Sequence, residues 1–168
     1  MPSPVRTVEE WRQAPRAERL ARLTLTGDEL ARAMAGQGPE RLARRPDGVN
    51  WAPVEILCHL RDTEESFLDR FRLVLTMDEP RFPTTNPNRW AAERQYLRHD
   101  AAPALEAFRR RRAETLAFLR ELSDGQWDRA GVQMDSRGRR TLDDFLAVMA
   151  WHDPNHLDQF RRAVEGHA

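Results

Sequence analysis

The sequence predicts an all-α protein, a four-helix bundle that forms one domain over residues 1–168. The chain has 168 residues, 40% of them hydrophobic, which is enough to bury one substantial core. Four segments carry apolar residues at the three- and four-residue steps of a helix, and most of the prolines and glycines fall between them. No stretch alternates apolar and polar residues over more than a few positions, as a half-buried strand would.

The first predicted helix covers roughly residues 16–36 and ends where Gly36 stops the periodic pattern. Residues 26–29, Thr-Gly-Asp-Glu, have the form of a capping box, so two shorter helices that break at Gly27 would fit the pattern equally well. Either version buries one face. We expect residues 1–15, ahead of this helix, to form a loosely packed N-terminal segment.

The second predicted helix runs from about residue 53 to residue 77. Pro53 suits its first turn, where a missing N–H costs nothing. One stripe of this helix faces the core and consists of Ile56, Leu60, Thr63, Phe67, Phe71 and Val74.

The third and fourth predicted helices cover roughly residues 100–122 and 141–165. Residues 109–112 are four consecutive arginines in the third helix, and we expect them to form a solvated face. The fourth helix begins at Thr141, whose hydroxyl can cap the first turn.

The connection over residues 78–99 is unusually long for a compact domain. A helix of roughly 25 residues measures about 37 Å at 1.5 Å per residue, and this connection can span that length. The second and third helices can therefore run parallel. The length also predicts a covering loop with a functional role rather than a plain link.

Charge and cysteine content exclude several classes of protein. The 27 basic and 27 acidic residues cancel, so no net field attracts nucleic acid or an anionic membrane. Cys58 is the single cysteine, which excludes an intrachain disulfide and fits a reducing compartment. No apolar run approaches the roughly 20 residues of a membrane span, and no secretory leader opens the sequence. We expect a cytoplasmic protein without nucleic-acid or membrane partners.

The fourth helix contains the sequence His152-Asp-Pro-Asn-His156, which places two imidazoles one above the other on one face. Such a pair is a weak signal alone, because short motifs arise by chance. Its position is more informative, since both histidines fall on the stripe that should face the core: Phe145, Met149, His152, His156, Phe160 and Ala163. Imidazoles that face an apolar seam need polar partners.

His59 is the third candidate and lies at the inner edge of the second helix's stripe. A bundle that packs these faces together can bring three imidazole nitrogens to one point. Three histidines with an open fourth position are the usual ligands of a catalytic zinc or a similar metal. The alternative is a set of core histidines that bond to carbonyl oxygens. Cys58 points about 100° away from His59 and is better explained as a small buried hydrophobe.

Three polar neighbours could orient these imidazoles. Asp62 follows His59 by three residues, Glu55 precedes it by four, and Gln159 follows His156 by three. Metal-bound imidazoles usually donate their second N–H to such groups, although ordinary helix-surface polarity would also explain them. If His59 is not a ligand, Asp62, Glu55 or Glu93 would complete the site. We leave out the two remaining histidines, His99 and His167, and identify no general acid or base.

The pattern as a whole resembles the DinB/YfiT-like superfamily of metal-dependent enzymes. The matching stretches are residues 45–51, 55–64, 90–96, 122–131, 141–145 and 152–159. The resemblance implies up-down-down-up connectivity and a nickel- or zinc-type ion on His59, His152 and His156. It also implies a homodimer and, from similar proteins, thiol S-transferase or isomerase activity with bacillithiol, mycothiol or glutathione. Ala52 departs from the Ser or Thr that commonly caps the second helix in such sequences.

Two functions remain open from the sequence. The first is a metal-dependent enzyme, a thiol-dependent S-transferase or a hydrolase, that acts on a small molecule under the 78–99 loop. The second is a non-catalytic bundle with a structural metal or histidine cluster that acts through dimer contacts. A fourth protein ligand would favour the structural role, and a three-ligand site with an open position would favour the enzyme.

Overall fold

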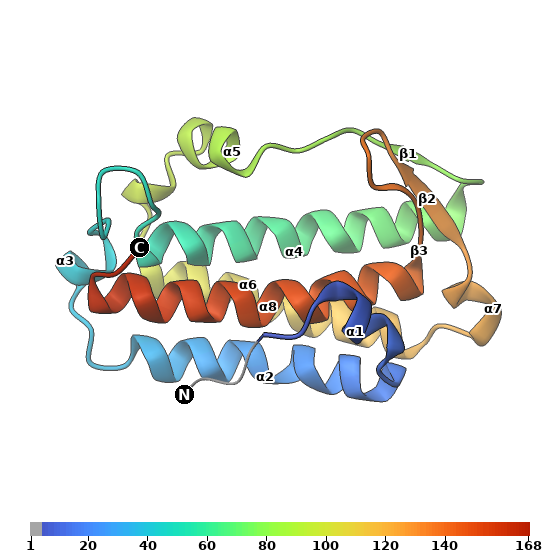
Figure 1. The fold of residues 1–168 in the computed structure, drawn as a ribbon, viewed down its shortest axis with the longest axis horizontal. Coiled ribbons are helices and arrows are strands. Elements are labelled where there is room, and N and C mark those ends of the chain that lie inside the picture. The colour runs from blue at the N-terminus through green and yellow to red at the C-terminus, as the bar shows by residue number, and fades with distance from the viewer. Residues whose placement is uncertain (1–4) are drawn as a thin grey trace.

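Four long helices dominate the computed structural model, which describes residues 5–168 (Figure 1). They match the four predicted segments and are α2 (Arg16–Met34), α4 (Pro53–Thr76), α6 (Ala101–Arg120) and α8 (Leu142–Glu165). Helix α2 continues through Gly27 without a break. None of the helices in residues 5–168 combines the length and apolar character needed to cross a membrane.

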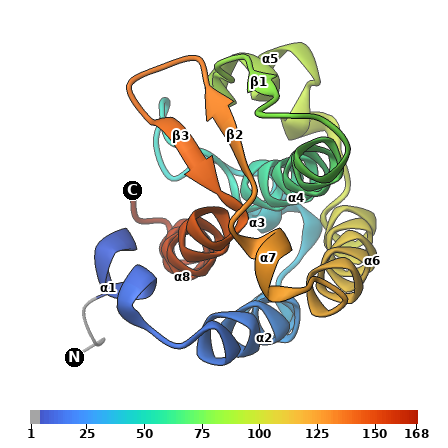
Figure 2. The same ribbon diagram turned by 90° about the vertical axis from the view of Figure 1, so that its right-hand side faces the viewer.

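The four helices have up-down-down-up connectivity, which confirms the predicted fold class. Helices α2 and α8 run in one direction along the bundle, and α4 and α6 run in the other (Figure 1). The end view shows the four helices around a common core (Figure 2). The most extensive packing joins the parallel pair α4 and α6 and the parallel pair α2 and α8.

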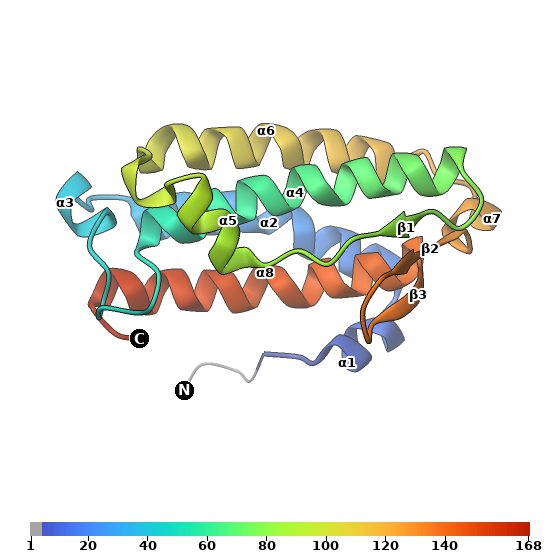
Figure 3. The same cartoon turned by 90° about the horizontal axis from the view of Figure 1, so that it is seen from above.

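The connection between α4 and α6 returns along the whole bundle, past α4 (Figure 3). It is structured rather than irregular. It contains β1 (Arg81–Phe82), α5 (Pro87–Glu93) and a 3-10 helix (Tyr96–Arg98). Tyr96 is fully buried against α4, which fixes the returning segment to the bundle.

A small sheet covers one end of the bundle, and here our expectation of no strands was wrong. Strand β1 pairs in parallel with β2 (Ala130–Gln133), which pairs antiparallel with β3 (Gly138–Thr141). These strands have two to four residues, so their sequences are too short to show alternation. Two short helices, α3 (Pro39–Leu42) and α7 (Asp124–Trp127), lie in the connections between α2 and α4 and between α6 and β2.

The N-terminal segment is more ordered than we expected for residues 1–15. Helix α1 (Val8–Gln13) begins with a capping box between Thr7 and Glu10 and packs on α8. Its Trp11 is buried. Residues 1–4 lie outside the described residues.

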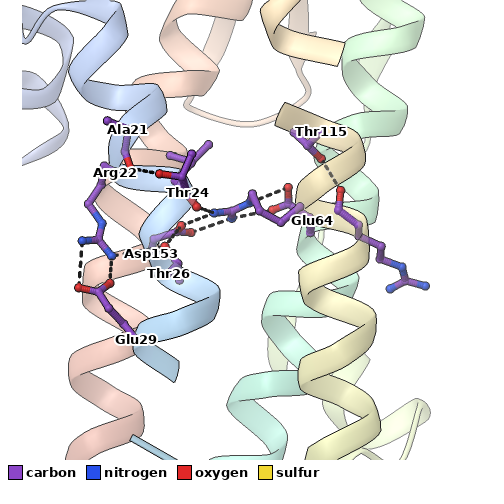
Figure 4. Close-up of polar contacts among 11 residues, drawn as sticks. Ala21, Arg22, Thr24, Thr26, Glu29, Glu64, Thr115 and Asp153 are labelled. Atoms are coloured by element: carbon purple, nitrogen blue, oxygen red, sulfur yellow. Dashed lines mark hydrogen bonds and ion pairs between the residues drawn. The ribbon is translucent and has the colours of Figure 1, made fainter. Parts of the chain in front are cut away.

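The expectation of a solvated arginine run was wrong at Arg112, which is only 5% exposed. Its guanidinium donates to Glu64 at 2.9 and 2.7 Å, to Asp153 and to the Leu23 carbonyl. Thr26 also donates to Asp153, so the buried cluster joins all four long helices (Figure 4). Charges this deeply buried require such complete pairing.

The apolar core has two clusters, one toward each end of the bundle. One contains Leu57, Leu60 and Phe108, and the other contains Phe67, Phe71 and Phe145, among further residues. On α8, the cluster that contains Phe145 has Ala150 as its last residue, and the cluster that contains Leu57 begins on this helix at Leu157. The turns of α8 that carry His152 and His156 therefore lie between the two clusters.

Candidate metal centre

The structure brings His59, His152 and His156 together. The Nε2 atom of His59 lies 3.1 Å from the Nε2 atoms of both His152 and His156. One nitrogen from each residue lies within 4.8 Å of the other two. Helix α8 supplies two of them because residues four apart lie on one face, and α4 supplies the third across the seam.

Aromatic side chains pack against two of the three imidazoles, those of His59 and His152. The ring of Trp51 lies 5.0 Å from that of His59, and the ring of Phe67 meets that of His152 edge-on at 6.3 Å, centroid to centroid. His59 is 6% exposed, and His152 and His156 are half-buried. Packing on rigid helices leaves the imidazoles little freedom to turn away from one another.

Hydrogen bonds at the far ring nitrogens leave Nε2 free to act as a ligand. Gln159 Oε1 lies 2.8 Å from His156 Nδ1, so this nitrogen donates its N–H to the amide oxygen. Thr63 Oγ1 lies 3.4 Å from His59 Nδ1 and can accept in the same way, though weakly. In this tautomer the Nε2 atoms of His59 and His156 carry a lone pair directed into the cluster.

All three imidazoles are held in the neutral form that binds metals. Burial, and then the neighbouring His156, lower the pKa of His59 to about 3. Burial also lowers the pKa of His156, and it lowers the pKa of His152 well below the usual value. A buried set of neutral nitrogens whose lone pairs converge repels itself unless a cation or a proton lies between them.

This donor set fits a divalent transition metal. Zinc–imidazole bonds of about 2.0–2.1 Å place neighbouring nitrogens around a tetrahedral ion about 3–3.5 Å apart, near the two 3.1 Å separations observed. In the described part of the chain, no Cys, Asp or Glu joins the three histidines as a fourth ligand. The arrangement is therefore that of a site with an open coordination position.

Two of the polar residues predicted to support the imidazoles serve other purposes. Asp62 accepts hydrogen bonds from Arg61 at 2.7 Å, Arg94 at 2.6 Å and Tyr96 at 2.8 Å. Burial alone would raise the pKa of Asp62, but these bonds lower it overall. Asp62 thus anchors the returning segment to α4. Of the three predicted partners, Gln159 alone contacts a histidine of the cluster.

Glu55 lies at the start of α4 and forms an ion pair with Arg45, at 2.7 and 2.9 Å. It also accepts the backbone N–H of Ala52 at 2.8 Å, which caps the helix without a Ser or Thr. Glu93, the other alternative ligand, forms an exposed pair with Arg89. Neither carboxylate reaches the cluster.

Three other potential metal ligands, Cys58, His99 and His167, do not join the cluster of three histidines. Cys58 is fully buried beside the Tyr96 carbonyl, as expected for a small hydrophobe. Burial raises the pKa of its thiol to about 11. His99 is exposed, and its Nδ1 accepts a hydrogen bond from the Arg61 guanidinium at 3.3 Å. His167 lies on the rim of a pocket near His156.

Two pockets open onto the histidine cluster. The first, which we call the sheet-side pocket, has a volume of about 340 Å³ and lies between α4, α8, the sheet and the returning segment. It is lined by His59, His152, His156, Thr63, Phe67, Arg70, Gln133, Arg137, Arg140 and Val148, together with Trp51, Thr85, Pro87, Trp90 and Trp151. Because Thr85, Pro87 and Trp90 contribute, residues 78–99 do cover the cluster.

The second pocket, of about 280 Å³, lies at the other side of the cluster, toward the end of α8. It shares Trp51, Trp151, His152 and His156 with the sheet-side pocket, and Gln159 also lines it. Trp151 is 36% exposed, a large apolar surface at the junction of the two openings.

Sequence reasoning missed several residues of this site. Thr63 follows His59 by four residues on the same face, so the spacing that identified Gln159 could have identified it too. The walls made by Trp51, Trp90 and Trp151 come from three separate segments. No local pattern connects them, and only the fold shows that they meet.

The fold and the cluster together define a four-helix bundle with a three-histidine centre. The model of the DinB superfamily matches residues 22–160, and the chain belongs to this family. YfiT from Bacillus subtilis (strain 168) is 25% identical over 107 residues, which are 64% of this chain and 60% of YfiT. The alignment thus spans about three fifths of the length of that relative.

The solved structure of YfiT superposes with a TM-score of 0.81, covers 98% of this chain and 91% of the YfiT chain, and is 20% identical. YfiT is described there as a probable metal-dependent hydrolase with an unusual four-helix bundle topology. At this identity the likeness establishes the shared fold.

Proposed function

We propose that this protein is a metal-dependent hydrolase that acts on a small molecule. One observation carries the proposal: three imidazole Nε2 atoms converge at the wall of a pocket of about 340 Å³, without a fourth Cys, Asp or Glu ligand among the described residues. The description of YfiT as a probable metal-dependent hydrolase supports it. An open position argues against a purely structural ion, which would have a closed set of ligands.

The residues of this chain have distinct roles in such a reaction. His59, His152 and His156 would hold the ion, and Gln159 keeps His156 in the metal-binding tautomer. A divalent ion at such a site lowers the pKa of a bound water and polarises a substrate carbonyl or phosphoryl oxygen. Trp51 and Trp151 restrict access of bulk water from two sides and offer flat apolar surfaces to a substrate.

No Asp or Glu side chain lines either pocket in the described part of the chain. The reaction would therefore proceed without a carboxylate general base from the described residues. Proton transfer then falls to solvent that enters through the two openings, to the substrate itself, or to His167 on the rim of the second pocket. This separates the site from metalloproteases, where a glutamate beside the ion serves as the base.

A thiol-dependent S-transferase is the second candidate, and the two pockets favour it. Both contact the same pair of histidines from different sides, which suits a reaction of two substrates, a low-molecular-weight thiol and an electrophile. An ion of borderline softness, such as zinc or nickel, binds and activates thiolates as well as water.

The experiment uses protein produced without an affinity tag. Its metal content is measured, and one portion is stripped with a chelator and another reloaded with zinc or nickel. Each is assayed on a panel of small esters and amides without thiol, and on 1-chloro-2,4-dinitrobenzene with glutathione, bacillithiol or mycothiol. Hydrolysis that disappears on stripping and returns on reloading supports the hydrolase. Conjugation that requires the thiol would identify the transferase instead. Protein that takes up neither metal contradicts both.

A further inference from the structure

The inner face of the small sheet contributes polar side chains to the sheet-side pocket. Strand β2 pairs Gly131 with Arg140 and Gln133 with Gly138 of β3. Opposed residues of an antiparallel pair point to the same face, so Arg140 shares the face of Gly131. Gln133 follows Gly131 by two residues and points to that face as well. Both line the pocket that contains the three histidines.

Arg70 reaches the same pocket from α4. It follows Thr63 by seven residues, two turns along the same side of the helix. Its guanidinium lies 5.5 Å from the ring centroid of Phe82. Within residues 5–168, the Arg70 side chain forms no hydrogen bond and no ion pair. The pocket therefore contains a half-buried cation that no described carboxylate contacts directly, although Asp135 acts on it from a distance.

Two further polar atoms in the pocket wall lack partners. Arg140 Nε and Gln133 Oε1 are buried, and neither has a hydrogen-bond partner among the described residues. Gln133 as a whole is only 5% exposed. Buried polar groups are almost always satisfied in folded proteins, so such groups in a pocket wall indicate a ligand that satisfies them.

The nearby carboxylates are already engaged. Asp135 forms an ion pair with Arg137, the third arginine of the pocket, at its exposed rim. Asp144 accepts from the backbone and hydroxyl of Thr141 and pairs with Arg12. Burial and the neighbouring Arg137 lower the pKa of both Arg70 and Arg140, and Arg12 adds to the effect on Arg140. Asp135 opposes the shift of both pKa values, and Asp144 opposes that of Arg140, without cancelling them. Arg137 thus adds unfavourable positive charge next to both Arg70 and Arg140, which a bound anion would offset.

We propose that Arg70 and Arg140 bind an anionic group of the substrate, a carboxylate or a phosphate, in the pocket that holds the three histidines. Guanidinium groups match the oxygens of both anions with paired N–H donors. Gln133 adds a hydrogen bond, and Trp51, Trp90 and Trp151 contact the apolar part of the molecule. The substrate is therefore a small amphiphilic anion. The inference rests on the proposed function only in assigning this anion to the substrate.

The test measures anion binding in protein from which metal has been removed by a chelator, because an anion could otherwise bind the ion itself. Calorimetry at pH 7.5 and constant ionic strength compares benzoate, phenyl phosphate and neutral benzamide. We expect at least one anion to bind tenfold or more tightly than benzamide, and the better anion identifies the group. Arg70→Gln and Arg140→Gln should each weaken that binding about tenfold. The matched control is Arg139→Gln, since Arg139 lies on the other face of β3, exposed and paired with Glu79.

Equal binding of the anions and benzamide to the wild-type protein would overturn the proposal, and this comparison requires no variant to fold. Unchanged affinity in both Arg70→Gln and Arg140→Gln, with native circular dichroism, would overturn it as well. An equal loss of anion affinity in Arg139→Gln would also overturn it, because anions would then respond to the overall positive charge of the surface rather than to the pocket. Because the measurement uses no metal and no turnover, its failure is distinguishable from failure of the hydrolase proposal.

Discussion

Asp153 connects the buried charge cluster to the candidate metal centre. It follows His152 directly on α8, is 1% exposed, and accepts hydrogen bonds from Arg112 of α6 and Thr26 of α2. Its contacts fix the position of the α8 turn that carries the two histidines. The cluster therefore supports the geometry of the site as well as the stability of the bundle.

Removing the cation of this cluster should be far more harmful than removing its neighbour. Arg112→Gln leaves the carboxylates of Glu64 and Asp153 buried without their partner, so we expect a loss of about 3–5 kcal/mol in the free energy of unfolding. Arg110→Gln, two residues earlier and exposed, should change it by less than about 0.5 kcal/mol. Urea unfolding followed by circular dichroism measures both, and similar values for the two variants would contradict this account.

The three histidines should be needed for metal binding and not for folding. His59→Ala, His152→Ala and His156→Ala should each weaken metal affinity severely, because each removes one of three protein ligands. Helical content should survive, because the apolar clusters do not depend on the ion. Competition with a chromophoric chelator and far-UV circular dichroism measure the two properties. His99→Ala is the control, and wild-type affinity in His59→Ala would refute the three-histidine centre.

Residues on a periodic stripe were predictable from the sequence, and the buried arginine was not. His152 and His156 interrupt an apolar stripe, and this pattern by itself indicates that both side chains face inward. Arg112 belongs to a run of identical residues. What distinguishes it is the approach of Glu64 and Asp153, which are 48 and 41 residues away in sequence.

At the scale of elements, strand β2 depends on a glycine at position 131. A Cβ there would clash with the ring of Phe82, lying 2.9 Å from its Cζ atom, and would approach the Pro80 carbonyl to 3.1 Å. Phe82 packs in turn against Phe145 in the core. The close approach of β1 to β2 therefore requires the absence of a side chain.

Gly131→Ala should thus destabilise the protein by about 1–3 kcal/mol, because the core ring must move to admit the methyl group. Gly48→Ala provides a matched control, since the added Cβ there meets no atom within 4 Å and the site is exposed. The melting temperatures of the two variants give the comparison. An unchanged melting temperature for Gly131→Ala would show that the close packing of β2 against Phe82 contributes little to the free energy of unfolding.

The returning segment is held by Asp62, and this attachment should depend on pH. Hydrogen bonds from Arg61, Arg94 and Tyr96 lower the pKa of Asp62 below its unfolded value near 3.9, so its contribution to stability is complete above that pH and is lost as the pH falls. Asp62→Asn should cost about 1–3 kcal/mol at pH 7, and the difference from wild type should shrink below about pH 4. Asp69→Asn, at an exposed carboxylate, should show little effect at any pH.

The long helices were predictable because each repeats its signal over five turns or more. The sheet was not, because a two-residue strand has no period to detect, and β1 pairs with a strand some 50 residues further along the chain. Helix α1 and its capping box were not predicted, for a similar reason. Its helix has six residues, and the burial of Trp11 depends on contact with α8 at the far end of the sequence.

For the whole molecule, metal binding should add stability to a bundle that already folds. An ion that binds only the native state at 100 times its dissociation constant adds about 2.7 kcal/mol. For a chain of this size that corresponds to a rise of about 5–10 °C in melting temperature. Scanning calorimetry of stripped and zinc-loaded protein measures it, with His152→Ala as the variant that should show no rise. Stripped protein without a cooperative transition would favour a structural ion.

The distribution of ligands along the chain has a consequence for biosynthesis. His59 is separated by 93 and 97 residues from the two histidines of α8, which follows every other long helix in the chain. Until α8 emerges from the ribosome, the nascent chain therefore carries one of the three cluster ligands, His59, and a single protein bond holds a divalent ion poorly. We therefore expect metal loading to await docking of α8, and a product truncated before α8 to bind metal weakly.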